Sequence, residues 1–266
     1  MKRLDVHLHE AGLAESREQA RRLVMAGAVL VNGQKAAKPS QAVPEGALVE
    51  IARESPYVSR GGFKLEKALN EFAIDPAGQI AADIGASTGG FTDCMLQRGA
   101  AKVYAVDVGY GQMHQKLRGD SRVVVLERTN ARYLTHEQIP EPIQLATVDV
   151  AFISLKLILP PLIALLAPGA DVVALVKPQF EAEPRYLKKG VVRDGAVHAA
   201  VLNDILSWVS TQPVCVAGLS WSPITGPKGN IEFLLHLKKE AGEPILPDVQ
   251  AVVKAAHGGV KGNPME

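Results

Sequence analysis

Residues 82–91 read Ala82-Asp83-Ile84-Gly85-Ala86-Ser87-Thr88-Gly89-Gly90-Phe91, which carries the end of an apolar strand into a glycine-rich loop and then a helix. Glycines at such a turn let the backbone approach a ligand closely, and open α/β sheets hold ligands at the carboxyl ends of their strands. The spacing is not Gly-x-Gly-x-x-Gly, and no Gly-Lys-Ser/Thr follows. The dinucleotide fingerprint and the P-loop are therefore both poor fits.

The same loop suits S-adenosylmethionine, because its Asp-x-Gly is followed four residues later by a Gly-Gly pair. Asp107, just past the second predicted strand, is placed to accept hydrogen bonds from a ribose diol, and Asn130 after the third could contact the adenine edge. We predict that S-adenosylmethionine is the cofactor. The predicted cofactor residues are Asp83, Gly85, Ala86, Ser87, Gly89, Gly90, Phe91, Asp107 and Asn130.

Strand and helix patterns alternate from Ser59 onward. This alternation predicts an α/β domain of the Rossmann-like methyltransferase type, with a seven-stranded, mostly parallel sheet covered by helices on both faces. The predicted strands span residues 80–84, 102–106, 123–126, 147–153, 172–176, 214–219 and 231–237.

The N-terminal segment predicts a small α+β unit. Ser16-Arg17-Glu18-Gln19 is a capping box, in which Ser16 can bond the backbone N–H of Gln19 and Gln19 can reach back to Ser16. Residues 29–31 form a short strand pattern, and Asn32-Gly33 is a strong hairpin signal because a type I′ turn needs positive φ at both positions. A further apolar run over 47–51 closes the segment.

These patterns give four predicted parts. Residues 1–53 form the small domain, 54–58 a linker interrupted by a proline, and 59–241 the α/β domain. Residues 242–266 form a C-terminal extension, with one helical stretch around 249–256, which we interpret as an appendage.

The composition predicts a cytoplasmic protein whose net charge is close to zero. The 266 residues include 29 Lys and Arg against 28 Asp and Glu, so a polyanionic partner would need a local basic patch. Cys94 and Cys215 are far apart and give neither a disulfide framework nor a zinc site, so we expect two buried thiols. No apolar stretch reaches the roughly 20 residues of a membrane span.

Four charged residues lie at informative places in the larger predicted domain. Lys64 is near the start of its first helix, Asp149 and Glu232 are within apolar strands, and Lys177 is at a strand end. Charges inside apolar strands are costly unless paired, and the two lysines could supply partners. Taken singly, each of the four also has an ordinary structural interpretation.

The sequence resembles the TlyA or hemolysin A type of rRNA methyltransferase over nearly its whole length. The matching stretches are 59–65, the glycine loop, 148–154, 175–181 and 190–194, and Ser16-Arg17 through Asn32-Gly33 resembles an S4 RNA-binding domain. Residues 182–189 depart from the glycine-containing stretch expected there, which leaves the contacts of that loop open.

The resemblance implies an FtsJ-like catalytic domain with a Lys-Asp-Lys-Glu tetrad, here Lys64, Asp149, Lys177 and Glu232, that methylates the ribose 2′-hydroxyl of cytidine in 16S or 23S rRNA. A ribose hydroxyl is a weak acid, so its attack on a methyl group needs a base or acceptor held in line. We assign Lys177 as base or hydroxyl orienter and Asp149 as its aligning partner. Lys64 and Glu232 would position the ribose, and we expect no metal.

The expected partners are ribosomal RNA or ribosomal subunits, with neither DNA nor a membrane, and the expected oligomeric state is a monomer. Clustered basic residues would contact phosphates, and Phe152 would stack on a base pulled out of its helix or else be a plain core aromatic. The predicted RNA-binding residues are Arg3, Arg17, Arg21, Lys35, Arg60, Arg132, Phe152, Lys188 and Lys189.

Four other functions are considered as alternatives. The family's older name suggests a membrane-lytic protein, although no span or long amphipathic helix supports insertion. A non-catalytic S4-type RNA-binding or assembly factor would not need the tetrad to converge, and a dehydrogenase is disfavoured by the loop spacing. Methylation at a base carbon would require a nucleophilic cysteine, and Cys94 lies in the helix after the glycine loop, where it is poorly placed for such an attack.

Overall fold

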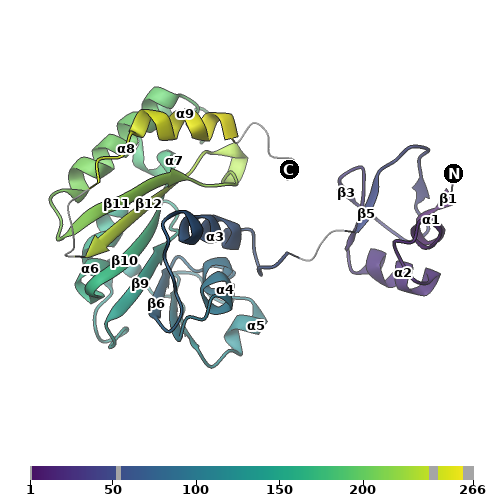
Figure 1. Ribbon diagram of the computed structural model, residues 1–266, viewed down its shortest axis with the longest axis horizontal. Coiled ribbons are helices and arrows are strands. Elements are labelled where there is room, and N and C mark those ends of the chain that lie inside the picture. Colours follow the sequence, from purple (N-terminus) through teal and green to yellow (C-terminus); the bar gives the residue numbers. More distant parts are fainter. Residues whose placement is uncertain (1, 52–54, 240–244, 260–266) are drawn as a thin grey trace. The chain divides into compact units, whose positions relative to one another are not determined.

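The computed structural model describes residues 2–51, 55–239 and 245–259 (Figure 1). The chain divides into two compact units, Met1–Pro56 and Tyr57–Glu266. The division falls within the segment 54–58 that the sequence assigns to a linker. Arg53, at the end of the predicted small domain, and Gly242, at the start of the predicted extension, lie outside the described residues.

The N-terminal unit packs two helices against short strands. Its core contains Leu4 and Leu8 from the first helix and Ala20 and Val24 from the second, all buried. A three-stranded antiparallel sheet has the order β3-β2-β5, and β1 pairs with β4. The elements are β1 (Lys2–Arg3), α1 (Leu4–Glu10), α2 (Arg17–Met25), β2 (Val29–Val31), β3 (Gln34–Lys35), β4 (Ala42–Val43) and β5 (Val49–Ile51).

Local signals explain most of this unit. Ser16 caps α2, because its hydroxyl accepts a hydrogen bond from the Gln19 N–H at 3.1 Å. The second half of the predicted capping box is wrong, since the Gln19 side chain accepts from the Glu15 N–H at 2.6 Å and not from Ser16. Asn32 and Gly33 have φ of 51° and 77°, which makes the predicted tight turn between β2 and β3.

The larger unit is built on a seven-stranded sheet, as predicted. Its order is β11-β12-β10-β9-β6-β7-β8, and β6 to β10 run parallel to one another, whereas β12 is antiparallel to both β10 and β11. The strands are β6 (Ile80–Ile84), β7 (Lys102–Val106), β8 (Val123–Leu126), β9 (Ile143–Val148), β10 (Leu166–Val176), β11 (Val214–Trp221) and β12 (Phe233–Lys239).

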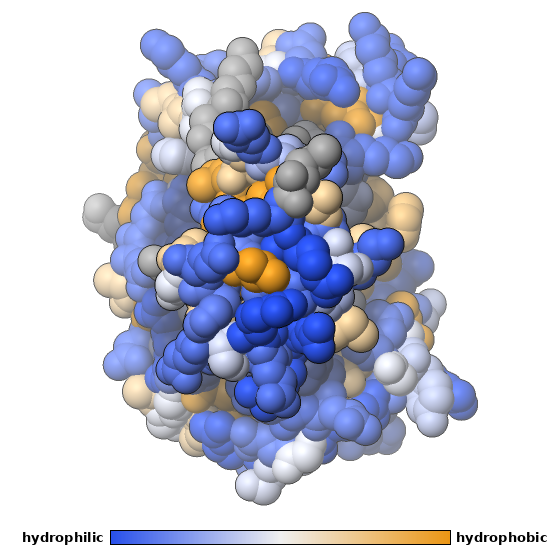
Figure 2. Space-filling view, turned by 90° about the vertical axis from the view of Figure 1, so that its right-hand side faces the viewer, coloured by the Kyte–Doolittle hydropathy of each residue, from blue (hydrophilic) through white to orange (hydrophobic). Residues whose placement is uncertain are grey.

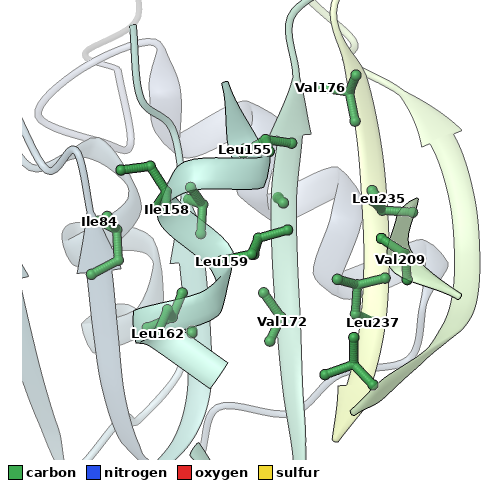
Figure 3. Packing of buried hydrophobic residues seen from close by; sticks show 14 of the residues in the cluster. Ile84, Leu155, Ile158, Leu159, Leu162, Val172, Val176, Val209, Leu235 and Leu237 are labelled. Atoms are coloured by element: carbon green, nitrogen blue, oxygen red, sulfur yellow. The ribbon is translucent and has the colours of Figure 1, made fainter. Parts of the chain in front are cut away.

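Helices cover both faces of this sheet. Buried residues of α3 (Gly61–Glu71), α4 (Gly90–Gln97) and α5 (Gln115–Arg118) pack on one face. On the other face α6 (Leu155–Leu165) lays Ile158, Leu159 and Leu162 toward the strands (Figure 3). This second layer also contains α8 (Gly195–Val209) and α9 (Val249–Gly259), while a short helix, α7 (Pro178–Glu181), follows β10.

The C-terminal helix corrects one prediction. Residues 249–259 are not an appendage, because Val253 and Ala256 of α9 are buried in the same apolar cluster as the sheet and α8. The apolar positions Val249, Val253 and Ala256 share one helix face, which explains why α9 docks instead of remaining exposed. The sequence pattern contained this stripe, but its surroundings rich in glycine and proline obscured it.

The strand order locates the site. The chain passes from β6 to β7 on one side and later returns to place β9 on the other side of β6. Loops leaving β6 and β9 therefore diverge at their carboxyl ends, and such a switch in strand order is where open α/β sheets bind ligands. Because β12 runs antiparallel, its first residue lies at this same edge of the sheet.

Candidate active site

The four charged residues of the predicted tetrad come together at that edge. Nζ of Lys64 lies 2.6 Å from Oε2 of Glu232 and 3.7 Å from Oδ2 of Asp149. Nζ of Lys177 lies 2.5 Å from Oδ1 of Asp149. The result is an alternating row of charges, Lys177, Asp149, Lys64 and Glu232, in which each carboxylate contacts at least one ammonium group.

The sheet register explains this convergence. Val176 pairs with Phe233, so Lys177 and Glu232, the next residues outward, lie at adjacent strand ends. Asp149 and Glu232 were predicted within strands, and this is wrong for both. Asp149 is the first residue after β9, where its N–H still donates to the Ile84 carbonyl at 2.8 Å before the chain leaves the sheet, and Glu232 directly precedes β12.

Burial makes the pairing obligatory. Glu232 is 1% exposed and Lys64 is 8% exposed, so an unpaired charge on either would be strongly destabilising. Burial by itself lowers the pKa of Lys64, but the nearby Asp149 and Glu232 carboxylates outweigh it and raise this pKa above its ordinary value. Lys64 therefore stays a cation, which suits a positioning role and not that of a base.

A cavity of about 590 Å³ opens beside the tetrad, a size typical of small-molecule sites. Three segments supply most of its wall: the start of α3, the glycine loop, and residues 224–229. Its lining includes Lys64 and Asp149, so the cavity reaches the tetrad directly. Six predicted cofactor residues line it, namely Asp83, Gly85, Ala86, Ser87, Gly90 and Phe91.

The glycine loop is shaped by contacts within the protein. Gly85 has φ of +85°, and a Cβ there would lie 2.4 Å from the Asp149 carbonyl oxygen. Gly90 lets α4 approach the start of α3, since its Cβ would lie 2.9 Å from the Gly62 backbone nitrogen and 2.2 Å from Oγ of Ser59, which precedes that helix. These glycines therefore serve close packing of the backbone around Asp149 and α3, in addition to the ligand approach that the sequence suggests.

Asp83 lies beneath the loop and is fully buried. Its Oδ2 accepts from the backbone N–H and hydroxyl of Thr92, at 2.9 and 2.7 Å, and its Oδ1 accepts from the Thr147 hydroxyl at 3.1 Å. Burial raises the pKa of Asp83 to about 6, although these hydrogen bonds oppose the rise. Asp83 thus ties α4 and β9 to the loop.

The other predicted cofactor residues lie elsewhere. Asp107 accepts from the Ser87 N–H at 2.8 Å and the Gly109 N–H at 2.6 Å, so it fixes the edge of the glycine loop. Asn130 is exposed, and its Oδ1 accepts from the Arg132 N–H at 3.0 Å. Gly89 packs on Leu117, where a Cβ would come within 2.3 Å of Cδ1.

An aromatic pair flanks the tetrad on the Lys177 side. Phe152 is 89% exposed, with φ of +62°, and its ring centroid lies 4.9 Å from that of Phe180. Nζ of Lys177 lies 5.9 Å from the Phe180 ring centroid. Phe152 is therefore not a core aromatic, and a positive φ in a bulky residue is a strained conformation of the kind that clusters at functional sites.

The cavity wall formed by residues 224–229 was missed by sequence reasoning. Arg60 donates to the Thr225 carbonyl at 3.1 Å, and a Cβ on Gly226 would lie 2.1 Å from Oε1 of Glu232. The buried Asn230 joins this segment to the next loop, since its Nδ2 donates to the Pro227 and Gly190 carbonyls at 3.0 and 3.1 Å. Gly-Pro-Lys-Gly before a strand was the available signal, but it is equally typical of an ordinary turn.

Predicted RNA-binding residues occupy separate surfaces. Arg3, Arg17 and Arg21 converge on the N-terminal unit around the carboxylate of Asp5, which the sequence analysis did not single out. Lys35 lies exposed in β3. In the larger unit, the remaining basic positions Arg60, Arg132, Lys188 and Lys189 are all exposed. The face drawn in Figure 2 is mostly hydrophilic, with only small apolar areas.

Family models match both parts of the chain. One described as FtsJ-like methyltransferase matches residues 57–239, and one described as S4 domain matches residues 2–49. The chain belongs to the FtsJ-like methyltransferase family. Relatives that match 98% and 88% of this chain place this FtsJ-like methyltransferase in the TlyA and hemolysin A group, as the sequence resemblance predicts.

Three similar proteins illustrate that group. YqxC of Bacillus subtilis, which carries the name of an rRNA methyltransferase, is 52% identical over 97% of this chain and 95% of its own length. The 16S/23S rRNA (cytidine-2′-O)-methyltransferase TlyA of Mycobacterium tuberculosis is 42% identical over 98% of both chains. A Streptococcus thermophilus structure named as a hemolysin is 46% identical, covers 100% of this chain and 98% of its own, and has a TM-score of 0.79.

Proposed function

We propose that this FtsJ-like methyltransferase is an S-adenosylmethionine-dependent enzyme that methylates the ribose 2′-hydroxyl of cytidine in 16S or 23S rRNA. The observation that carries the proposal is the convergence of Lys64, Asp149, Lys177 and Glu232 beside the glycine-loop cavity. A non-catalytic RNA-binding factor would have no use for four paired charges at a ligand cavity, because such groups cost stability when buried.

Lys177 and Asp149 are placed to act on the hydroxyl. The ribose oxygen takes the methyl group and loses its proton, which the Lys177 amine accepts or guides to solvent. Asp149 aligns Lys177 through the 2.5 Å contact and leaves other positions on that nitrogen for the ribose. Lys64, held as a cation between two carboxylates, orients the ribose together with Glu232.

The cavity fits the proposed cofactor. S-adenosylmethionine, when bound, supplies a methyl group activated by a positively charged sulfur. The backbone of residues 85–87 lines the cavity, and Asp149 and Lys64 bring the row of charges to its wall. Asp107 fixes the adjoining edge by holding Ser87, and we propose that its carboxylate also accepts hydrogen bonds from the ribose of the cofactor.

RNA would be held by two kinds of contact. Exposed basic residues of the S4 domain and of the catalytic domain would neutralise phosphates without reading sequence. Phe152 and Phe180 would stack on a base turned out of its helix, which would bring its ribose toward Lys177. Acting on rRNA would place the protein in the cytoplasm.

Two alternatives are less well supported. Cys94 is fully buried in α4, and burial raises its pKa to about 11, so it is a poor nucleophile for methylation at a base carbon. A membrane-lytic activity needs a surface that inserts into lipid. Within the described parts of the chain, no helix is both long and apolar enough to cross a membrane.

Mass-spectrometric mapping of ribose methylation would test the proposal. rRNA would be compared from cells with the intact gene, without it, and with the gene carrying Lys177→Ala or Lys102→Ala. Lys102 is a matched control, because it also contacts a carboxylate, Glu141 at 2.7 Å, but at the opposite edge of the sheet. We expect a cytidine 2′-O-methyl mark in wild type and the control alone. Its presence without the gene would refute the proposal.

A further inference from the structure

A buried carboxylate in the S4 domain contacts three arginines from two elements, Arg3 of β1 and Arg17 and Arg21 of α2. Asp5, in the first turn of α1, is 0% exposed. Its two oxygens accept from Nε and Nη2 of Arg3, both at 3.0 Å. Oδ2 also accepts from Nε of Arg21 at 3.2 Å and from Nη2 of Arg17 at 3.5 Å.

The arginines are not themselves buried. Their side chains are 49%, 52% and 56% exposed for Arg3, Arg17 and Arg21, so each keeps N–H donors that face solvent. One carboxylate against three guanidinium groups leaves the cluster with an excess of two positive charges. Hydrogen bonding from Arg3 holds the pKa of Asp5 well below its usual range against the opposing effect of burial, so the carboxylate stays charged.

We propose that Asp5 is a positioning residue that holds Arg3, Arg17 and Arg21 as one preformed site for a phosphate group of the RNA backbone. This inference rests on the proposed rRNA function. Free arginine side chains would lose conformational freedom on binding, whereas side chains already fixed by Asp5 lose less. The planar guanidinium can bond Asp5 along one edge and a phosphate along another.

Positioning by Asp5 and simple electrostatics predict opposite effects on RNA binding when the Asp5 charge is removed. Asp5→Asn removes a negative charge from a basic cluster, so charge alone would tighten RNA binding. Loss of positioning would instead weaken it, by about tenfold, and make its salt dependence shallower because fewer phosphate contacts form together. Glu10→Gln is the matched control: it removes an exposed carboxylate from the same helix, one that contacts Lys2 and not the three arginines.

Filter binding of the full chain to purified 16S and 23S rRNA at several salt concentrations would test this. We expect weaker binding by Asp5→Asn and equal or tighter binding by Glu10→Gln. Equal or tighter binding by Asp5→Asn would refute the positioning role of Asp5 but not the proposed rRNA function. No binding by the unaltered chain would refute both. Calorimetric titration with S-adenosylmethionine would show that the catalytic domain is intact in each variant.

A second variant covers the case in which Asp5→Asn unfolds the S4 domain, which circular dichroism would reveal. Arg21→Lys keeps the charge but replaces the guanidinium by a single ammonium, which cannot present two donor edges at once. We expect about tenfold weaker binding from this variant too. Unchanged affinity would show that charge is sufficient, and the positioning role would then be wrong.

Discussion

Nζ of Lys177 lies 2.5 Å from Oδ1 of Asp149, and the two residues directly follow β10 and β9, which are neighbouring parallel strands. This relationship is set by the backbone, since both side chains leave adjacent strand ends. The remaining oxygen of Asp149 faces Lys64, which in turn contacts Glu232. A substitution that displaces one side chain of the tetrad should therefore displace the side chains that contact it.

Gly226 offers a way to disturb Glu232 without touching a charge. Its φ of −72° is accessible to alanine, but an added Cβ would lie 2.1 Å from Oε1 of Glu232. We expect Gly226→Ala to lower methyl transfer by at least tenfold while the chain stays folded. Gly258→Ala, where nothing lies within 4 Å, serves as the control and should leave the rate unchanged. Single-turnover transfer by both variants would check this, and equal rates would refute the coupling.

Phe152 should matter for activity but not for stability. At 89% exposure its ring contributes little to the fold, whereas stacking on a base is worth about 1 to 3 kcal/mol. We expect Phe152→Ala to weaken methyl transfer roughly tenfold or more with an unchanged melting temperature, and Phe152→Trp to retain activity. Full activity of the alanine variant would remove the stacking role.

Asp83 should make the stability of the catalytic domain fall as pH rises. Its pKa is raised to about 6 in the folded state, so the folded protein holds a proton that the unfolded chain releases near pH 4. Stability from this group is complete below about pH 4 and falls by about 1.4 kcal/mol per pH unit up to the folded pKa. We expect Asp83→Asn to lack this decline in urea unfolding measured across that window, and a parallel decline in the variant would contradict the assignment.

The docking of α9 should depend on pH in the opposite sense. His198 is fully buried, its Nδ1 lies 3.0 Å from Nε2 of His257 on α9, and its other nitrogen lies 3.1 Å from the Val192 carbonyl. Burial lowers the pKa of His198, so the folded state favours the neutral imidazole. The stability that His198 contributes is therefore complete above the ordinary histidine pKa and is lost as the pH falls below that value. Hydrogen exchange should show α9 less protected at pH 5.5 than at 7.5 after correction for the intrinsic rate. His257→Ala should weaken that dependence.

Sequence patterns predicted the strands best where the chain is most regular. The strands 80–84, 102–106 and 123–126 have the predicted bounds, because short apolar runs end at glycine or charged residues. Asp149 and Glu232 were placed inside strands because apolar residues surround both in sequence. Whether a residue is the last in a ladder depends on its neighbouring strand, which sequence periodicity does not contain.

The charged residues of the candidate site could be predicted from the sequence more fully than the walls of its cavity. All four tetrad residues converge, yet the wall at 224–229 and the buried Asn230 and Asp5 were missed. Single polar residues between turn signals give no periodic pattern, so only the folded chain reveals that they are buried. Cys215 was expected to be buried and is half buried, because it lies in the edge strand β11.

Single-turnover transfer of labelled methyl to rRNA would test whether Lys177 acts on the ribose hydroxyl. The comparison is between wild type, Lys177→Ala and Lys177→Arg at several pH values with both substrates saturating. We predict that Lys177→Ala still binds both substrates but loses about 10² to 10⁴ in rate, and that arginine fails to restore it because guanidinium keeps its proton. A near-normal rate in Lys177→Arg would show that Lys177 supplies only positive charge, and this would contradict its role as base.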